Sequence, residues 1–336
     1  MPDGKPSPRS PLAILSEKRR LRRRLLDWYD RNARDLPWRR DRDPYRVWVS
    51  EIMLQQTRVA AVIEHYRTFI ARFPTVRALA KARESSILAA WSGLGYYRRA
   101  HMLHRAAKSV LRDYAGEFPA SAKKLRGLDG IGRYTAAAIA SIAFGEAAAV
   151  VDGNVERVLQ RLFSRQLLGE EPWELAEALL SRQRPGDFNQ AMMELGATLC
   201  TPRRPKCEAC PVFDFCVSHG ELEKAAKGKR QKRRTIGYTL NRSNGVIFLV
   251  QRPKQASLMP GMWELPEVSL ENGGTRPWLT LRHSITETDF IVQVRRSSSA
   301  QTTPQTIEGR WLRREQIVRL PLTGLARKIL RAAKVI

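Results

Sequence analysis

The sequence predicts a mainly α-helical domain followed by a smaller α+β domain. Before residue 220 the apolar residues recur at helical spacing, and no segment has the pattern of a strand. After a charged stretch at residues 224–234, short apolar and alternating segments lie between prolines and glycines. With 336 residues, 43% of them hydrophobic, the chain is long enough for two domains that each have a core.

The chain is strongly basic. It has 59 Lys and Arg residues against 33 Asp and Glu, a net charge of +26. A soluble protein tolerates such self-repulsion best beside a polyanion, most commonly nucleic acid; an anionic membrane surface is the alternative. No apolar run approaches the ~20 residues that span a bilayer, so we expect no membrane insertion.

The N-terminal residues 1–24 are predicted to be a basic flexible arm. They lack the apolar core of a secretory signal. Because they are rich in Arg, Ser and Pro, an organelle transit peptide stays open as an alternative. The last part of this arm, residues 18–24 (KRRLRRR), leads into the first helix.

Helical periodicity continues through the first domain. From Glu51 to Phe73 the apolar residues keep helical spacing, and Pro74 ends the run. Asn154 and Pro172 fit the N-cap and the first position of two later helices. The further helices are expected at residues 85–91, 100–112, 121–126, 134–144, 154–163 and 172–182.

The C-terminal third has a different pattern. Residues 223–235 form a charged linker without core residues. Val246–Val250 is short and apolar enough for a buried strand, and Phe290–Val294 alternates. With a last helix at residues 322–333, these segments predict an α+β domain over residues 236–336.

Residues 128–136 (LDGIGRYTA) predict a helix–hairpin–helix. Gly130 and Gly132 make a tight turn whose free N–H groups lie at a helix N-terminus, a geometry that binds one backbone phosphate without reading sequence. A plain turn between helices is the alternative. In the DNA-binding interpretation, Arg133 and Thr135 also contact the duplex.

Two carboxylates stand out. Glu51 opens a predicted helix, and Asp152 lies between an apolar run and another helix start. Each could simply be an acid that favours a helix N-terminus. For Asp152, however, we expect Asn154 to be the N-cap, which leaves the carboxylate free. The adjacent amides Gln55 and Gln56 suit a wedge that fills the gap left by an extruded base.

All four cysteines of the chain lie within 17 residues. Cys200, Cys207, Cys210 and Cys216 have the spacing C-x6-C-x2-C-x5-C. Such clustering indicates a metal or cluster site and not a disulfide framework. Zinc is the alternative, but zinc ribbons usually have two C-x2-C pairs, so ligation of an iron–sulfur cluster fits better.

These motifs, in this order and spacing, resemble the endonuclease III superfamily and, within it, the MutY-type adenine DNA glycosylases. The resemblance covers residues 25–222 closely and 236–336 more loosely. It implies a helix–hairpin–helix glycosylase domain with one 4Fe–4S cluster held by the four cysteines. It also implies an enzyme that removes adenine mispaired with 8-oxoguanine or guanine in duplex DNA and that acts as a monomer. The expected location is the cytoplasm (nucleoid) if the protein is bacterial, and the nucleus or mitochondrion if it is eukaryotic.

The resemblance also implies residue roles. Glu51 matches the acid that protonates the leaving adenine, and Asp152 matches the carboxylate that stabilises the sugar cation. Tyr134 and Asn154 match residues that position these two. Gln56 and Tyr96 match side chains that probe and wedge the duplex.

A bifunctional lyase and a non-catalytic DNA-binding protein are the alternatives to an adenine glycosylase. A bifunctional lyase of the superfamily has a lysine where this chain has Tyr134, and a tyrosine cannot form a Schiff base, so we expect no strong strand cleavage. A non-catalytic duplex-binding protein has no reason to retain Glu51, Asp152 and Gln56 together.

The C-terminal domain resembles the Nudix-like module of these glycosylases. It lacks the Glu-rich helix that holds magnesium in Nudix hydrolases, so we expect it to recognise the lesion without hydrolysis. The loop that reads 8-oxoguanine aligns with Ile285-Thr286-Glu287, a departure from the family pattern. Either other residues take this role, with His283, Ser284 and Thr286 as the candidates, or discrimination of the opposite base is looser.

Overall fold

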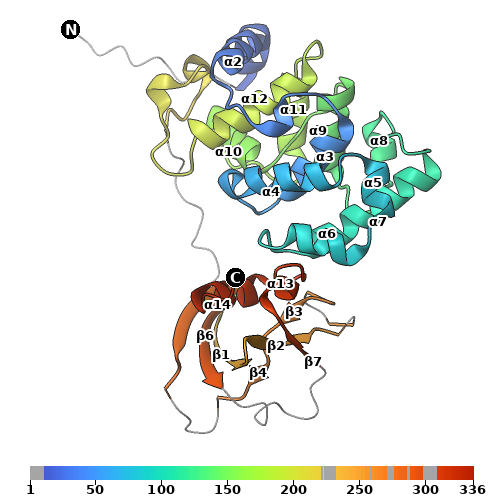
Figure 1. Cartoon of the computed structure of the whole chain (residues 1–336). Coiled ribbons are helices and arrows are strands. Elements are labelled where there is room, and N and C mark those ends of the chain that lie inside the picture. Colours follow the sequence, from blue (N-terminus) through green and yellow to red (C-terminus); the bar gives the residue numbers. More distant parts are fainter. Residues whose placement is uncertain are drawn as a thin grey trace. The chain divides into compact units, whose positions relative to one another are not determined.

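The fold is seen in a computed structural model of the chain. It describes residues 11–220, 222, 232–253, 255–256, 259–270, 276–285, 288–297 and 309–336. The backbone contacts divide the chain into two compact units (Figure 1). One consists of Met1–Ile70, Thr75–Arg77 and Arg105–Ala226, and the other of Ala71–Pro74, Ala78–His104 and Lys227–Ile336. A helical segment from the first third of the sequence thus belongs to the same unit as the C-terminal residues.

The described residues before 220 contain helices and no strand, as the periodicity predicts. Short 3-10 turns at Pro37–Arg39, Cys207–Ala209 and Phe213–Phe215 separate some of the helices. The α-helices are α1 Pro11–Ser16, α2 Lys18–Asn32, α3 Pro44–Leu54, α4 Val59–Arg72, α5 Val76–Lys81, α6 Glu84–Trp91, α7 Arg98–Asp113, α8 Ala122–Leu125, α9 Arg133–Phe144, α10 Gly153–Leu162, α11 Glu171–Leu179 and α12 Pro185–Thr198.

Helix α12 is central to the first unit. It contacts α2, α9 and α10, and α9 in turn contacts α3 (Figure 1). The core on this side contains Leu25, Leu159 and Phe188, all fully or nearly fully buried. Burial of such side chains stabilises each by about 1.5–3 kcal/mol, so this core fixes the helix ends that carry the candidate catalytic residues.

The predicted flexible arm is wrong for residues 11–24. Pro11–Ser16 and Lys18–Asn32 are helices, and Ile14 and Leu21 are buried in the same core as α12. The apolar residues among the arginines recur at helical spacing, so one face of α2 packs while the charges face outward. Residues 1–10 lie outside the described part of the chain.

The predicted continuous helix over Glu51–Phe73 is also wrong. Helix α3 starts earlier, at Pro44, and ends at Leu54, and α4 starts at Val59. Gln56 between them has a φ of +54°, a left-handed conformation that interrupts a helix. Glu51 therefore lies in the last turn of α3 and does not open a helix.

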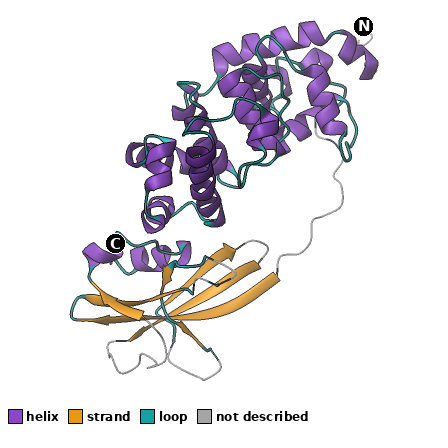
Figure 2. Ribbon diagram, turned by 90° about the vertical axis from the view of Figure 1, so that its right-hand side faces the viewer, coloured by secondary structure: helices purple, strands orange, loops and turns teal. Residues whose placement is uncertain are grey.

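The described C-terminal residues form a mixed sheet of seven strands with two helices, as the α+β prediction requires (Figure 2). The main strand order is β3-β2-β1-β6-β5; β4 pairs with β1, and β7 pairs with β2. The strands are β1 Lys232–Ser243, β2 Val246–Gln251, β3 Trp263–Glu264, β4 Glu267–Val268, β5 Leu279–Ile285, β6 Thr288–Ser297 and β7 Gly309–Leu312, and the helices are α13 Arg314–Ile317 and α14 Gly324–Ala332.

Strand β1 is not among the strands that the sequence predicts. It starts at Lys232, inside the expected linker 223–235, and pairs in parallel with β6 from Lys232↔Thr288 to Asn241↔Ser297. The linker prediction is therefore wrong for residues 232–235, and residues 223–231 lie outside the described part. Backbone pairing does not require apolar side chains, which is why a basic segment can form a strand.

None of the helices in the described part of the chain combines the length and the apolar character that a membrane span requires.

Candidate active site

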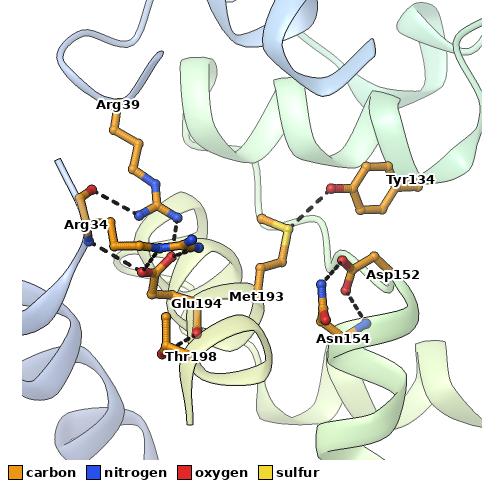
Figure 3. Close-up of polar contacts among 8 residues, drawn as sticks. All are labelled: Arg34, Arg39, Tyr134, Asp152, Asn154, Met193, Glu194 and Thr198. Carbon is orange, nitrogen blue, oxygen red and sulfur yellow. Dashed lines mark hydrogen bonds and ion pairs between the residues drawn. The ribbon is translucent and has the colours of Figure 1, made fainter. Parts of the chain in front are cut away.

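Glu51 and Tyr134 meet across the contact between α3 and α9. The Tyr134 hydroxyl donates a hydrogen bond to Glu51 Oε2 at 2.7 Å. It also lies 3.3 Å from the sulfur of Met193 on α12 (Figure 3). The Glu51 side chain is buried, with 6% of the residue exposed. The structure thus brings together two of the residues to which the family resemblance assigns roles in one site.

The environment of Glu51 favours its protonated form. The pKa of this carboxyl is raised to about 7, chiefly by burial; the negative charge of Asp152 adds to the rise, while the Tyr134 hydrogen bond and the charge of Arg39 act in the opposite direction. Burial also raises the pKa of Tyr134 well above its ordinary value, with the charges of Glu51 and Asp152 adding to the shift. A carboxylic acid with a pKa near neutrality can donate a proton at physiological pH.

Asp152 is the N-cap of α10, and the prediction that Asn154 would be the cap is wrong. Asp152 Oδ1 accepts hydrogen bonds from the backbone N–H groups of Asn154 (2.9 Å) and Val155 (2.8 Å). Asp152 Oδ2 accepts from the Asn154 side-chain amide at 2.9 Å (Figure 3). Three N–H donors and a helix N-terminus stabilise a negative charge on this carboxylate.

A chain of contacts links Asn154 to the cysteine loop. Arg157 donates one hydrogen bond to Asn154 Oδ1 at 2.9 Å and another to the backbone oxygen of Cys200 at 2.9 Å. Gly196 on α12 lies so close that an added Cβ would be 2.7 Å from Asn154 Cβ. The Asn154 side chain, which donates a hydrogen bond to Asp152, is thus itself fixed by Arg157 on one side and by Gly196 on the other.

The four cysteines are brought to one place, as their spacing predicts. Cys200, Cys207, Cys210 and Cys216 line a common cavity. Four thiols around one cavity match the ligand set of an iron–sulfur cluster.

Arg161 supports an anionic group in this cavity. Its buried guanidinium donates to Cys200 Sγ at 3.3 Å and to the backbone oxygens of Thr201 (2.7 Å) and Pro202 (3.0 Å). A cluster held by four thiolates carries negative charge, and a fixed cation beside one ligand offsets part of it. The residues present therefore fit an iron–sulfur cluster.

Glu194 is a buried charge that the sequence interpretation did not single out. This residue is 1% exposed, and its two oxygens accept hydrogen bonds from Arg34 (2.6 and 2.9 Å) and Arg39 (2.8 Å) (Figure 3). Burial acts to raise the pKa of Glu194, but the two arginines hold it below its ordinary value. No local pattern predicts this pairing, because the partners lie about 155 residues away in sequence.

The helix–hairpin–helix turn has the expected backbone. Gly130 has a φ of +75°, and Gly132 is the exposed N-cap of α9 with open space around it. Arg133 is exposed, pairs with Glu170 and lies 4.0 Å over the Trp173 ring. Thr135 is 2% exposed, so its predicted side-chain contact with DNA is wrong; the helix periodicity turns it toward α3.

The two predicted probing segments belong to different units. Gln56 is exposed with a left-handed backbone, and Gln55 extends its amide to Thr135 Oγ1 at 3.5 Å. Tyr96, in the second unit, is 46% exposed and also left-handed, with a φ of +46°. Non-glycine residues in this conformation are uncommon, and they concentrate at functional sites.

The candidates for lesion recognition lie at the end of β5. His283 is partly buried and pairs with Phe290 of β6, and burial together with the charge of Lys328 lowers its pKa. Ser284 continues the strand opposite Asp289. Thr286 lies outside the described residues.

Comparison with known proteins adds to this geometry. Residues 49–181 match the HhH-GPD superfamily of base excision DNA repair proteins, and residues 200–216 match the iron–sulfur binding domain of endonuclease III. The adenine DNA glycosylase of Schizosaccharomyces pombe is 38% identical, over 78% of this chain and 71% of the relative. This chain belongs to the adenine DNA glycosylase family.

The family assignment confirms the helix–hairpin–helix glycosylase fold and the 4Fe–4S cofactor that the cysteine spacing predicts. The adenine DNA glycosylase of Rattus norvegicus is 40% identical over 75% of this chain, and this chain spans 61% of its length. Among solved structures, a thermostable thymine-DNA glycosylase superposes with a TM-score of 0.58 at 34% identity, over 62% of this chain and 98% of that one.

Proposed function

We propose that this chain is a DNA glycosylase that removes adenine mispaired with 8-oxoguanine or guanine by hydrolysis of the N-glycosidic bond. The observation that carries the proposal is the buried Glu51 carboxyl, hydrogen-bonded to Tyr134, whose pKa of about 7 is raised in part by Asp152. A buried acid beside a second carboxylate that is hydrogen-bonded by three N–H donors divides the roles of acid and anion between them.

Glu51 supplies the proton in this proposal. Adenine leaves poorly as an anion, so a proton on one of its ring nitrogens lowers the barrier to bond cleavage. At pH 7 about half of a group with a pKa of 7 is protonated, enough to support catalysis at neutral pH. The Tyr134 hydroxyl holds the carboxyl in one orientation.

Asp152 supplies the opposite charge. As the base departs, the deoxyribose becomes oxocarbenium-like, and a nearby carboxylate stabilises it. The three N–H donors from Asn154 and Val155 keep the Asp152 carboxylate in place. Its position is therefore set before the substrate arrives, which is the condition for efficient electrostatic stabilisation.

Strand cleavage is not part of the proposed activity. A lyase step needs an amine that forms a Schiff base with the abasic sugar. The position that would hold this amine has Tyr134, and its hydroxyl is hydrogen-bonded to Glu51. The product is therefore an abasic site in an intact strand.

The C-terminal sheet is proposed to be a Nudix-like module that recognises the base opposite adenine. His283 lines a cavity with Tyr96 and with Arg327 and Lys328 of α14. Its lowered pKa leaves the imidazole neutral at pH 7, able both to donate and to accept a hydrogen bond. Together with Ser284 and Thr286 it is the candidate reader of 8-oxoguanine, and the protein acts as a monomer on duplex DNA.

The test uses duplexes that carry adenine opposite 8-oxoguanine, adenine opposite guanine, or thymine glycol. We expect adenine release with the strand intact until alkali is added. Nicking without alkali would favour the lyase, and tight binding without release would favour a non-catalytic binder. The Asp152→Asn variant keeps a good N-cap residue, so it should bind the duplex and release no adenine.

A further inference from the structure

The loop that carries Tyr96 has an unusual backbone. Residues 92–97 connect α6 to α7, and Gly93, Gly95 and Tyr96 have φ values of 111°, 71° and 46°. Glycine adopts such values readily, but a tyrosine does so rarely. The surrounding structure must therefore hold Tyr96 in place, and two sets of contacts do so.

The first set comes from the helices on either side of the loop. The Arg99 guanidinium lies 5.4 Å from the Tyr96 ring centre and 5.5 Å from that of Trp91, and it donates to the backbone oxygens of Leu94 and Gly95. The Trp91 indole N–H also donates to Gly95 O at 3.1 Å. These contacts join the loop to the helices α6 and α7 that flank it.

The second set comes from the C-terminal residues of the same unit. The Tyr97 hydroxyl donates to the backbone oxygen of Leu322 at 2.8 Å, and the Ser92 hydroxyl donates to the same oxygen at 3.0 Å. Arg327 Nε on α14 donates to Ser92 Oγ at 3.1 Å. Tyr97 is 1% exposed, and Ser92 is also buried, so water does not compete for these bonds.

The backbone around Leu322 is held in place by hydrogen bonds. Trp263 of β3 forms a bridge with Leu322, and its N–H and C=O bond to Pro321 O (2.8 Å) and Thr323 N (2.9 Å). The Thr323 hydroxyl caps α14 by accepting from Ala326 N at 3.1 Å. The Leu322 oxygen is therefore held by both the sheet and the helix of the C-terminal fold.

We propose that Tyr97, Ser92 and Arg327 are positioning residues that fasten the Tyr96 loop to Leu322 and so hold Tyr96 ready to enter the duplex. This proposal rests on the proposed function, in which Tyr96 wedges the DNA while adenine is flipped. In this arrangement the C-terminal residues contribute to base extrusion itself, in addition to reading the opposite base.

The test is Tyr97→Phe, which removes one hydroxyl and keeps the buried ring. Ser92 still donates to Leu322, so the fold is retained. The matched control is Tyr66→Phe, because the Tyr66 hydroxyl is buried and has no hydrogen-bond partner within the described residues. We expect amide hydrogen exchange of residues 93–96 to speed up about fivefold in Tyr97→Phe and to stay unchanged in Tyr66→Phe, as one hydrogen bond of the loop is lost.

The functional readout is base flipping, measured by the fluorescence of 2-aminopurine in place of the target adenine. Tyr97→Phe should lower the flipped fraction about fivefold, and in a Tyr96→Ala background it should have no further effect. Unchanged loop exchange, or additive effects of the two substitutions, would overturn the proposal. If the wild-type chain released no adenine, the proposed function would fail, whereas hydrogen exchange would still decide whether Leu322 fixes the loop.

Discussion

Replacement of Glu51 by glutamine should inactivate the chain and stabilise it at the same time. Glutamine has the shape of glutamate, and its side-chain oxygen can still accept the hydrogen bond from Tyr134. It cannot donate the proton that the departing adenine needs. It also cannot acquire the buried negative charge that the wild-type chain carries above neutral pH.

The magnitude follows from the pKa of Glu51. Its folded-state pKa is about 7, against an ordinary value of 4.5. The folded state therefore binds this proton more tightly, and stability falls as the pH rises from 4.5 through 7. At about 1.4 kcal/mol per pKa unit, the loss is about 2 kcal/mol at pH 6 and about 3 kcal/mol at pH 8.

The assay compares thermal unfolding of the wild type and Glu51→Gln at pH 6 and pH 8, at equal iron content. The variant should melt higher at both values, with the larger gap at pH 8. Glu117→Gln, at an exposed position, is the control and should show no pH-dependent gap. A gap that is absent, or equal at the two pH values, would show that Glu51 is not held protonated by the fold, and the assignment of the acid would fall with it.

Three further predictions concern the same unit. The single-turnover rate of adenine release should be level below pH 7 and fall about tenfold per pH unit above it, because the protonated fraction of Glu51 falls in that way; a level rate up to pH 9 would exclude this acid. Glu194→Gln should lower the free energy of unfolding by about 3 kcal/mol in urea titrations, because two arginines lose their buried partner, and an effect below 1 kcal/mol would contradict this. Gly196→Ala should reduce adenine release more than duplex affinity, because the methyl group displaces Asn154; equal losses in both would indicate general misfolding.

Most of the chemistry could be predicted from the sequence because it depends on residue type and order. The cysteine spacing, the glycine turn and the two carboxylates are local or strictly ordered features. The contact between Tyr134 and Glu51, 83 residues apart, followed only from the family resemblance. The Glu194 pair could not be found at all, because a buried charge leaves no trace in local periodicity.

The errors have physical causes that the sequence partly shows. The pattern over Glu51–Phe73 keeps helical spacing across the break at Gln56, so periodicity alone could not reveal two helices. Strand β1 was missed, although Asn244-Gly245, both at positive φ, is the strongest short hairpin signal and joins β1 to β2. The basic composition of residues 232–235 hides the strand, whereas the turn residues reveal it.

The N-cap position of Asp152 has a consequence for which residues this site can tolerate. Several short polar side chains can cap a helix at this position, and Asn or Ser would do so nearly as well as Asp. Only an ionised side chain, however, can stabilise the positive charge on the sugar. Aspartate alone meets both demands, so mutational drift at this codon would yield a well-folded but inert protein long before it yielded an unfolded one.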